Sequence, residues 1–282
     1  MNDCLPVTLP PLPGEVLSSW ISRHADYYGV TPLNMLRHCL PEITTLRALD
    51  LTLSNDSTSR IAEMFSISSK AVRDMSFAMS PKVAHRFIAK QPVHYCLNCH
   101  SKVTESAFLR SELQGWRITC PICGRFYPEQ LPNDYSSTFA PYHDAALRGE
   151  KLLNDHAEHG LETWLPPLEI ARLMLMRRIP KPFPSGGDLW QYRLLGAIIP
   201  NLDIFITKQK SFPYSPKNPI LPLQVRPALL AGIAIVEQSG PAMLKMLQGH
   251  MLEENRNRFV MATDHLIAPI FDWGQPQQLQ LI

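Results

Sequence analysis

Four cysteines have the spacing that binds one metal ion. Cys96, Cys99, Cys120 and Cys123 form two Cys-x-x-Cys pairs separated by 20 residues. Two such pairs, each in a tight turn, supply four thiolates for a tetrahedral Zn²⁺ ion. Gly124 follows the second pair, where the turn requires a residue that adopts a positive φ. The sequence therefore predicts one structural Zn²⁺ ion.

The same four cysteines allow two other interpretations, which are two disulfides or four unrelated buried thiols. A catalytic zinc site is not expected, because four thiolates leave no coordination position for water. The motifs G-x-x-x-x-G-K-[ST], G-x-S-x-G and H-E-x-x-H do not occur in the sequence. His156 and His159 share a helix face, and we expect them to be surface side chains. The sequence does not indicate an enzyme.

Charge and composition indicate an intracellular protein. The net charge of +2 excludes a strong global field for nucleic acids, so DNA binding would depend on a local patch. The first residues lack the basic start and apolar run of a signal peptide, and no apolar run is long enough to cross a membrane. We expect Cys4 and Cys39 to be buried free thiols in a reducing cytoplasm.

The pattern of apolar residues predicts a mainly α-helical chain in three parts. Residues 1–92 form an N-terminal helical domain, residues 93–130 a small zinc-ribbon-like module, and residues 131–282 a C-terminal helical domain. A first helix is expected over 15–28, with Val16, Leu17, Trp20, Ile21 and His24 on its apolar face. Thr31 and Pro32 begin a second helix, as its N-cap and first residue.

Residues 58–77 have the pattern of a helix-turn-helix. Ser66 lies in the turn, Ser68 caps the second helix, and Val72 and Met75 face inward. If that second helix enters a major groove, three of its side chains would reach the DNA: Ser69, Lys70 and Arg73. An ordinary helical hairpin without DNA contact is the alternative.

Other basic residues are further candidates for phosphate contact. A basic link with Lys82, His85, Arg86, Lys90 and His94 follows the helix-turn-helix. The zinc module adds three arginines, which would contact either phosphates or acidic residues of a partner: Arg110, Arg117 and Arg125. Of this whole set, the predicted DNA-binding residues are Arg86, Lys90 and Arg117. A solvated connector is an equally simple explanation of the link.

The C-terminal part contains further helical segments. We expect helices over 145–164, interrupted at Gly160, over 168–179, and over 189–199. A last helical region spans 226–252 and is broken at 239–241. Residues 211–222 hold four prolines and should be extended, and the glutamine-rich tail 274–282 should lack regular structure.

These motifs, in this order, resemble the TniQ family over about residues 7–127. The resemblance rests on Pro11-Leu12-Pro13-Gly14-Glu15 with Leu17-Ser18-Ser19-Trp20 and Arg23, on Val72-Arg73-Asp74-Met75-Ser76, and on Tyr95-Cys96-Leu97-Asn98-Cys99. The family often has Cys-Pro-x-His in its second knuckle and adds another Cys-x-x-Cys pair. This chain has Cys120-Pro121-Ile122-Cys123 alone, so one zinc ion is expected.

The resemblance implies a non-enzymatic adaptor that selects target sites in transposition. Such adaptors recruit a AAA+ ATPase regulator, which then engages the transposase. Some recognise attachment-site DNA directly, and others dock onto an RNA-guided CRISPR effector. Head-to-tail homodimers occur in the family. The alternative function is a sequence-specific transcriptional regulator that reads DNA with its helix-turn-helix.

Overall fold

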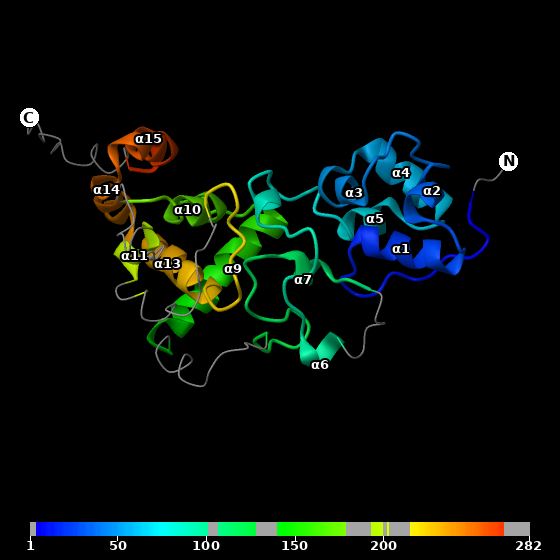
Figure 1. Ribbon diagram of the computed structural model, residues 1–282, viewed down its shortest axis with the longest axis horizontal. Helices are drawn as coiled ribbons and strands as arrows, with labels where there is room; N and C mark the ends of the chain where they lie inside the picture. The colour runs from blue at the N-terminus through cyan, green and yellow to red at the C-terminus, as the bar shows by residue number, and fades with distance from the viewer. Residues whose placement is uncertain are drawn as a thin grey trace, which may run out of the picture. The chain divides into compact units, whose positions relative to one another are not determined.

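The computed structural model describes residues 4–100, 107–127, 140–178, 193–199, 202 and 215–267 (Figure 1). Within these ranges the regular structure is helical, accompanied by isolated β-bridges, which confirms the predicted mainly α-helical class. The chain divides into two compact units. The first comprises Met1–Glu129 and Ala157–Gly160, and the second comprises Gln130–His156 and Leu161–Ile282. The predicted division into three domains, at residues 92 and 130, remains a prediction.

Five helices at the start of the first unit share one core. They are α1 (Leu17–Tyr27), α2 (Pro32–Leu36), α3 (Leu46–Thr52), α4 (Asn55–Met64) and α5 (Ser69–Asp74). Figure 1 shows them gathered in one bundle. The Trp20 ring lies 4.7 Å from that of Phe65, and both side chains are fully buried. All five residues predicted for the apolar face of the first helix are buried.

A buried carboxylate holds the start of α1 in place. Glu15 is 1% exposed and forms a bidentate ion pair with Arg23, with both N···O distances at 2.7 Å. The same carboxylate accepts hydrogen bonds from the Ser19 hydroxyl and from the backbone amide of Leu12. A charged group without water requires such partners, and four donors surround the two carboxylate oxygens of Glu15. This network fixes the position in the chain at which α1 begins.

The segment after residue 106 is hydrogen-bonded to the N-terminal helices. The backbone amide of Phe108 donates to the Ser19 hydroxyl at 2.8 Å, and Glu15 forms an antiparallel bridge with Leu109. The short helix α7 (Arg110–Leu113) follows. A second bridge joins Ile88 to Gln114. Residues 107–116 are therefore a structural partner of α1 and of the 87–93 segment.

A second buried carboxylate caps α1 from a distant part of the sequence. The Asp50 side chain, at the end of α3, accepts a hydrogen bond from the backbone amide of Ser18 at 3.0 Å. An acceptor at this place satisfies one of the amides that a helix N-terminus leaves unpaired. Burial raises the pKa of Asp50 to about 6, against the smaller opposite effect of its bond to Ser18.

Helix α13 lies at the centre of the second unit. The helices of this unit are α9 (His143–His159, whose last turn belongs to the first unit), α10 (Pro167–Met174), α11 (Leu195–Ile198), α13 (Arg226–Ser239), α14 (Pro241–Gly249) and α15 (Glu253–Ile267). Helices α10, α11 and α14 all contact α13. At Gly149 of α9, an added Cβ would lie 2.0 Å from the carbonyl oxygen of Leu230, so these two helices meet backbone to backbone.

Several expectations about the C-terminal part need correction. The predicted helix over 168–179 ends at Met174. His156 is buried and not a surface residue, and its Nε2 lies 2.9 Å from a carboxylate oxygen of Glu162. Helix α15 was not predicted. The break at 239–241 is confirmed by Gly240, which has a φ of 74°. The tail 274–282, residues 189–192 and residues 211–214 lie outside the described residues, and within 193–199 the helical part is α11 (Leu195–Ile198).

Cys4 also differs from expectation, because its thiol is exposed, whereas Cys39 is half-buried. Burial raises the pKa of Cys39 to about 11. Among the described residues, no single helix is both long and apolar enough to span a membrane; α13 and α14 reach that length and hydropathy only as a pair, bent by 116°.

We expect Glu15→Gln to destabilise the first unit by about 3 kcal/mol, because the half-buried Arg23 guanidinium would lose its counter-charge. Chemical denaturation measures the free energy of unfolding. The matched control is Asp74→Asn, which removes the same charge from an exposed ion pair with Lys70 and should change stability by less than about 1 kcal/mol. Equal effects of the two substitutions would contradict the role given to Glu15.

We expect Gly149→Ala to destabilise the second unit by about 1–3 kcal/mol, because its new methyl group would overlap the backbone of Leu230. Gly249→Ala is the matched control, since nothing lies within 4 Å of a Cβ at that helical position. There, alanine should stabilise the chain by up to about 1 kcal/mol. Thermal unfolding of both variants tests this, and a neutral Gly149→Ala would show that α9 and α13 are not in close contact.

Candidate metal centre

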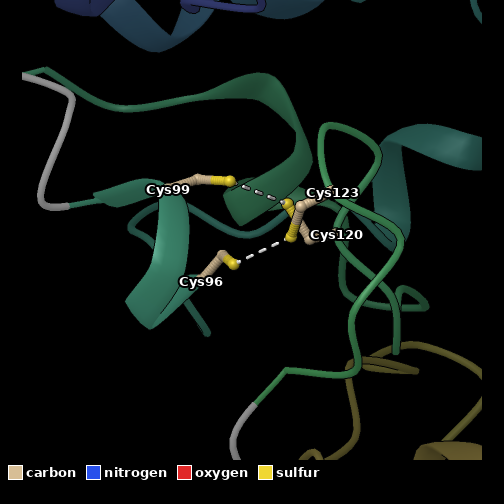
Figure 2. Close-up of side chains that lie close together, drawn as sticks. All are labelled: Cys96, Cys99, Cys120 and Cys123. Atoms are coloured by element: carbon tan, nitrogen blue, oxygen red, sulfur yellow. Dashed lines mark hydrogen bonds between the residues drawn. The ribbon is translucent and has the colours of Figure 1, made fainter.

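The four cysteines predicted to bind metal come together in the first unit. Cys96 and Cys99 lie just before and within α6 (Leu97–His100), and Cys120 and Cys123 lie in a turn. Figure 2 shows their side chains pointing toward one another from these two segments. All four sulfur atoms lie within 4.8 Å of one another. The interpretation as four unrelated thiols is therefore wrong.

The sulfur–sulfur distances fit a tetrahedral metal ion. The Sγ atoms of Cys96 and Cys123 are 3.5 Å apart, and those of Cys120 and Cys99 are 3.9 Å apart. Four sulfurs bound to one Zn²⁺ at the usual length are about 3.8 Å apart. A disulfide requires about 2.05 Å, and all six cysteines are free, so the disulfide interpretation is also wrong.

The second knuckle has the backbone that its sequence predicts. Gly124 has a φ of 70°, as expected for the residue after the last cysteine, and its amide donates to the carbonyl oxygen of Cys120 at 2.8 Å. The Cys120 amide in turn donates to the carbonyl of Arg125, and Thr119 bridges to Phe126. The knuckle is thus a tight hairpin that holds two thiols on one side.

Backbone hydrogen bonds and burial shift the pKa values of these thiols in opposite directions. The backbone amide of Arg125 donates to Cys123 and lowers its pKa to about 6. Burial raises the pKa of Cys99 to about 12, and it also raises that of Cys120. Four thiolates this close would repel one another without a cation. A bound divalent ion would offset that repulsion and keep all four deprotonated, as a structural site requires.

Two ring side chains pack beside the cysteine pairs. His94, two residues before Cys96, is buried, so this member of the predicted basic link is not part of a solvated connector. Its ring centroid lies 4.0 Å from that of Tyr127, and its Nε2 lies 2.8 Å from the carbonyl oxygen of Ser111. The only sequence signal for this role is its position directly before the first knuckle. His94 is thus part of the packing of the module.

Helix α5 carries three of the six predicted DNA-binding residues. Ser66 has a φ of 53° in the turn before it, and the Ser68 hydroxyl accepts from the amide of Ala71, as the helix-turn-helix pattern predicts. Lys70 is exposed but forms a 2.5 Å ion pair with Asp74, and Ser69 and Arg73 are half-buried. The helix thus presents a cation that already has a carboxylate partner.

The other predicted contacts lie on different segments. Arg86 is the last residue of a short 3₁₀ helix (Ala84–Arg86), and both it and Lys90 are exposed. Arg117 is half-buried, and its Nε donates to the side-chain oxygen of Gln114. Arg110, also a candidate, is paired with Glu158 at 2.7 Å and lies over the ring of Phe77. Arg110 is therefore engaged within the protein.

We expect the purified chain to bind one divalent metal ion, and Cys99→Ser to abolish that binding. Loss of metal should also expose residues 95–127 to proteolysis, because a small module buries too little to fold without it. Metal analysis and limited proteolysis measure both effects. Cys4→Ser is the control, since the Cys4 thiol is exposed and outside the cluster. A metal-free variant with unchanged protease resistance would contradict the prediction.

Comparison with known proteins gives one match. Residues 6–125 match the model of the TniQ family. No curated protein and no solved structure matches the chain. The matched range begins in the proline-rich segment before Glu15 and includes the predicted helix-turn-helix and all four clustered cysteines. It agrees with the resemblance seen in the sequence, and TniQ domains are associated with target selection in transposition. The N-terminal part of this chain, residues 6–125, therefore belongs to the TniQ family.

Proposed function

We propose that this protein is a non-enzymatic adaptor in transposition, which links a target-recognition element to a AAA+ ATPase regulator. The observation that carries the proposal is the family match over residues 6–125. Its motifs are joined in one compact unit by the hydrogen bonds around Glu15 and Phe108. A rigid unit with several distinct surfaces suits a protein that holds two partners together.

We further propose that the metal ion is Zn²⁺ and that its role is structural. Four thiolates are a typical structural zinc set and leave no position for a substrate or water. The reducing cytoplasm, the expected compartment, keeps such cysteines available for metal. The partners would be the ATPase regulator and DNA, either bound directly or through a guide-RNA effector complex, and a homodimer is also compatible with the proposal.

The geometry of α5 favours an adaptor over an independent transcriptional regulator. This helix has six residues, which is about 9 Å, and so offers a short surface to a major groove. Its most exposed cation, Lys70, is paired with Asp74, which would also repel phosphate. Strong independent DNA binding usually involves a basic surface, and the net charge of the chain is only +2. In this proposal, DNA contacts only support a complex that forms mainly through protein–protein contacts. The residues that could make them are Ser69, Lys70, Arg73, Arg86 and Lys90.

The first test is a pull-down of the metal-loaded protein with the AAA+ ATPase encoded beside it, with and without duplex DNA. Capture of the ATPase is the expected result. Failure to capture it, together with nanomolar binding to one defined duplex, would instead establish the transcriptional regulator.

A second measurement isolates α5. In the adaptor, Lys70→Gln with Arg73→Gln should change duplex affinity by no more than about twofold and leave its salt dependence unchanged. The matched control is Arg86→Gln with Lys90→Gln, which removes two exposed charges outside α5. A loss of about tenfold or more from the α5 pair alone would show that this helix reads DNA.

A further inference from the structure

Three exposed cations occur on a short segment of the first unit, between α5 and the first cysteine pair. We call residues 82–90 the basic segment, and its exposed side chains are those of Lys82, Arg86 and Lys90. Among the residues that the structure describes, none of these three side chains takes part in an ion pair or a side-chain hydrogen bond. The basic segment therefore presents three charges that the fold does not compensate.

The sequence around the basic segment contains no acidic side chain. No Asp or Glu occurs between Asp74 and Glu105. The helices before it differ in this respect, because Lys70 is paired with Asp74 at 2.5 Å and Arg60 with Asp56 at 3.0 Å. A nearby carboxylate thus reduces the charge of α4 and α5, whereas the charge of the basic segment is retained.

The backbone of the basic segment is held in place by the rest of the first unit. The guanidinium group of Arg47 donates to the carbonyl oxygens of Ala89 and Ile88, at 2.6 and 2.5 Å. The carbonyl oxygen of Phe87 accepts from the amide of Gly115 at 2.8 Å. Because this backbone is already ordered, binding of a ligand would cost only the ordering of the three long side chains.

The histidines of the predicted basic link do not add to this charge. The Nε2 atom of His85 lies 3.3 Å from the carbonyl oxygen of Phe77, and burial lowers the pKa of His85, so its ring is neutral at pH 7. His94 is buried. The charge that this part of the chain presents to solvent therefore comes from two lysines and one arginine.

We propose that the basic segment binds the phosphate backbone of duplex DNA, through Lys82, Arg86 and Lys90. Phosphates are bound mainly by uncompensated cations, whatever the base sequence. Three such contacts are few beside the roughly 6–10 of a strongly salt-dependent DNA-binding protein, so this contact suits a protein that stays on DNA with the help of a partner. The proposal rests on the proposed adaptor function and adds the place at which the adaptor would contact DNA.

An acidic protein segment fits this surface less well. Protein–protein interfaces are typically built around an apolar centre with a polar rim. The exposed residues of 82–91 are the three cations and Gln91, so no apolar side chain of this stretch is exposed. A polyanion that binds by charge alone matches such a surface better.

The test measures how salt affects the binding of a labelled, random-sequence DNA duplex to the full-length, metal-loaded chain, by fluorescence anisotropy. The basic-segment variant combines Lys82→Gln, Arg86→Gln and Lys90→Gln. The matched control variant removes three charges from exposed positions of the same unit where each side chain already has a partner, and it combines Arg37→Gln, Arg60→Gln and Lys70→Gln. Metal content and thermal unfolding show that both variants are folded.

The basic-segment variant should bind the duplex at least about tenfold more weakly at low salt. Its slope of log K against log salt concentration should be shallower by about 2–3, because each phosphate contact contributes about 0.9. The control variant should change the affinity by no more than about twofold and leave the slope unchanged.

Several results would overturn the proposal. An equal loss of affinity in both variants would show that net charge matters and not the basic segment. An unchanged slope in the basic-segment variant, or no binding of the duplex by the parent chain at low salt, would reject phosphate contact there. Loss of ATPase capture by the basic-segment variant with DNA binding unchanged would assign these cations to an acidic protein, and tighter binding of single-stranded RNA than of the duplex would assign them to RNA.

The outcomes also separate this proposal from the adaptor role. If the ATPase is captured and the basic-segment variant binds DNA like the parent chain, the DNA contact fails and the adaptor role stands. If the basic-segment variant loses DNA binding and its salt dependence but the parent chain captures no ATPase, the DNA contact stands and the adaptor role fails.

Discussion

The buried carboxylate of Glu15 is the constraint on which the first unit depends. A carboxylate that is 1% exposed is stable only when its oxygens are bonded, and here Arg23, Ser19 and Leu12 provide the donors. Since Ser19 gives its proton to Glu15, its oxygen is available to accept from the amide of Phe108. One ionised group thus determines both the start of α1 and the position of a segment some 90 residues later in the chain.

This arrangement gives the metal centre a rigid support. A module of four cysteines and few buried side chains cannot build a large core of its own. Here the segment between the two knuckles is bridged to Glu15 and Ile88, and Trp116 contacts the ring of Phe87. The metal would therefore connect the two knuckles, and the second knuckle directly follows this bridged segment in the chain. Metal binding and the packing of α1 are expected to stabilise each other for that reason.

Much of this could be predicted where the signal is local. The cysteine spacing, the positive φ of Gly124, the Thr31 and Ser68 caps and the buried face of α1 all follow from residues a few positions apart. Helix α3 was missed because it has only seven residues, and its Asp50 acts on a helix 32 positions away. Helix α15 was missed because only three of its side chains are buried. Its sequence therefore shows a weak apolar periodicity.

The partners of the charged residues were the hardest feature to predict from the sequence, for a physical reason. A sequence shows how many arginines and lysines lie in a segment but not which carboxylate each one meets after folding. Arg23 meets Glu15, Arg110 meets Glu158 and Lys70 meets Asp74. The first two pairs are largely removed from solvent, so those arginines are poor candidates for phosphate contact.

This pairing reduces the basic surface that is available to bind DNA. A protein that holds DNA by itself needs many unneutralised cations along one face, because each phosphate contact adds to the affinity through counterion release. Here ion pairs within the first unit take up candidates on α5 and α7. The distribution of charge in this unit therefore fits the proposed recruitment of proteins better than independent DNA binding.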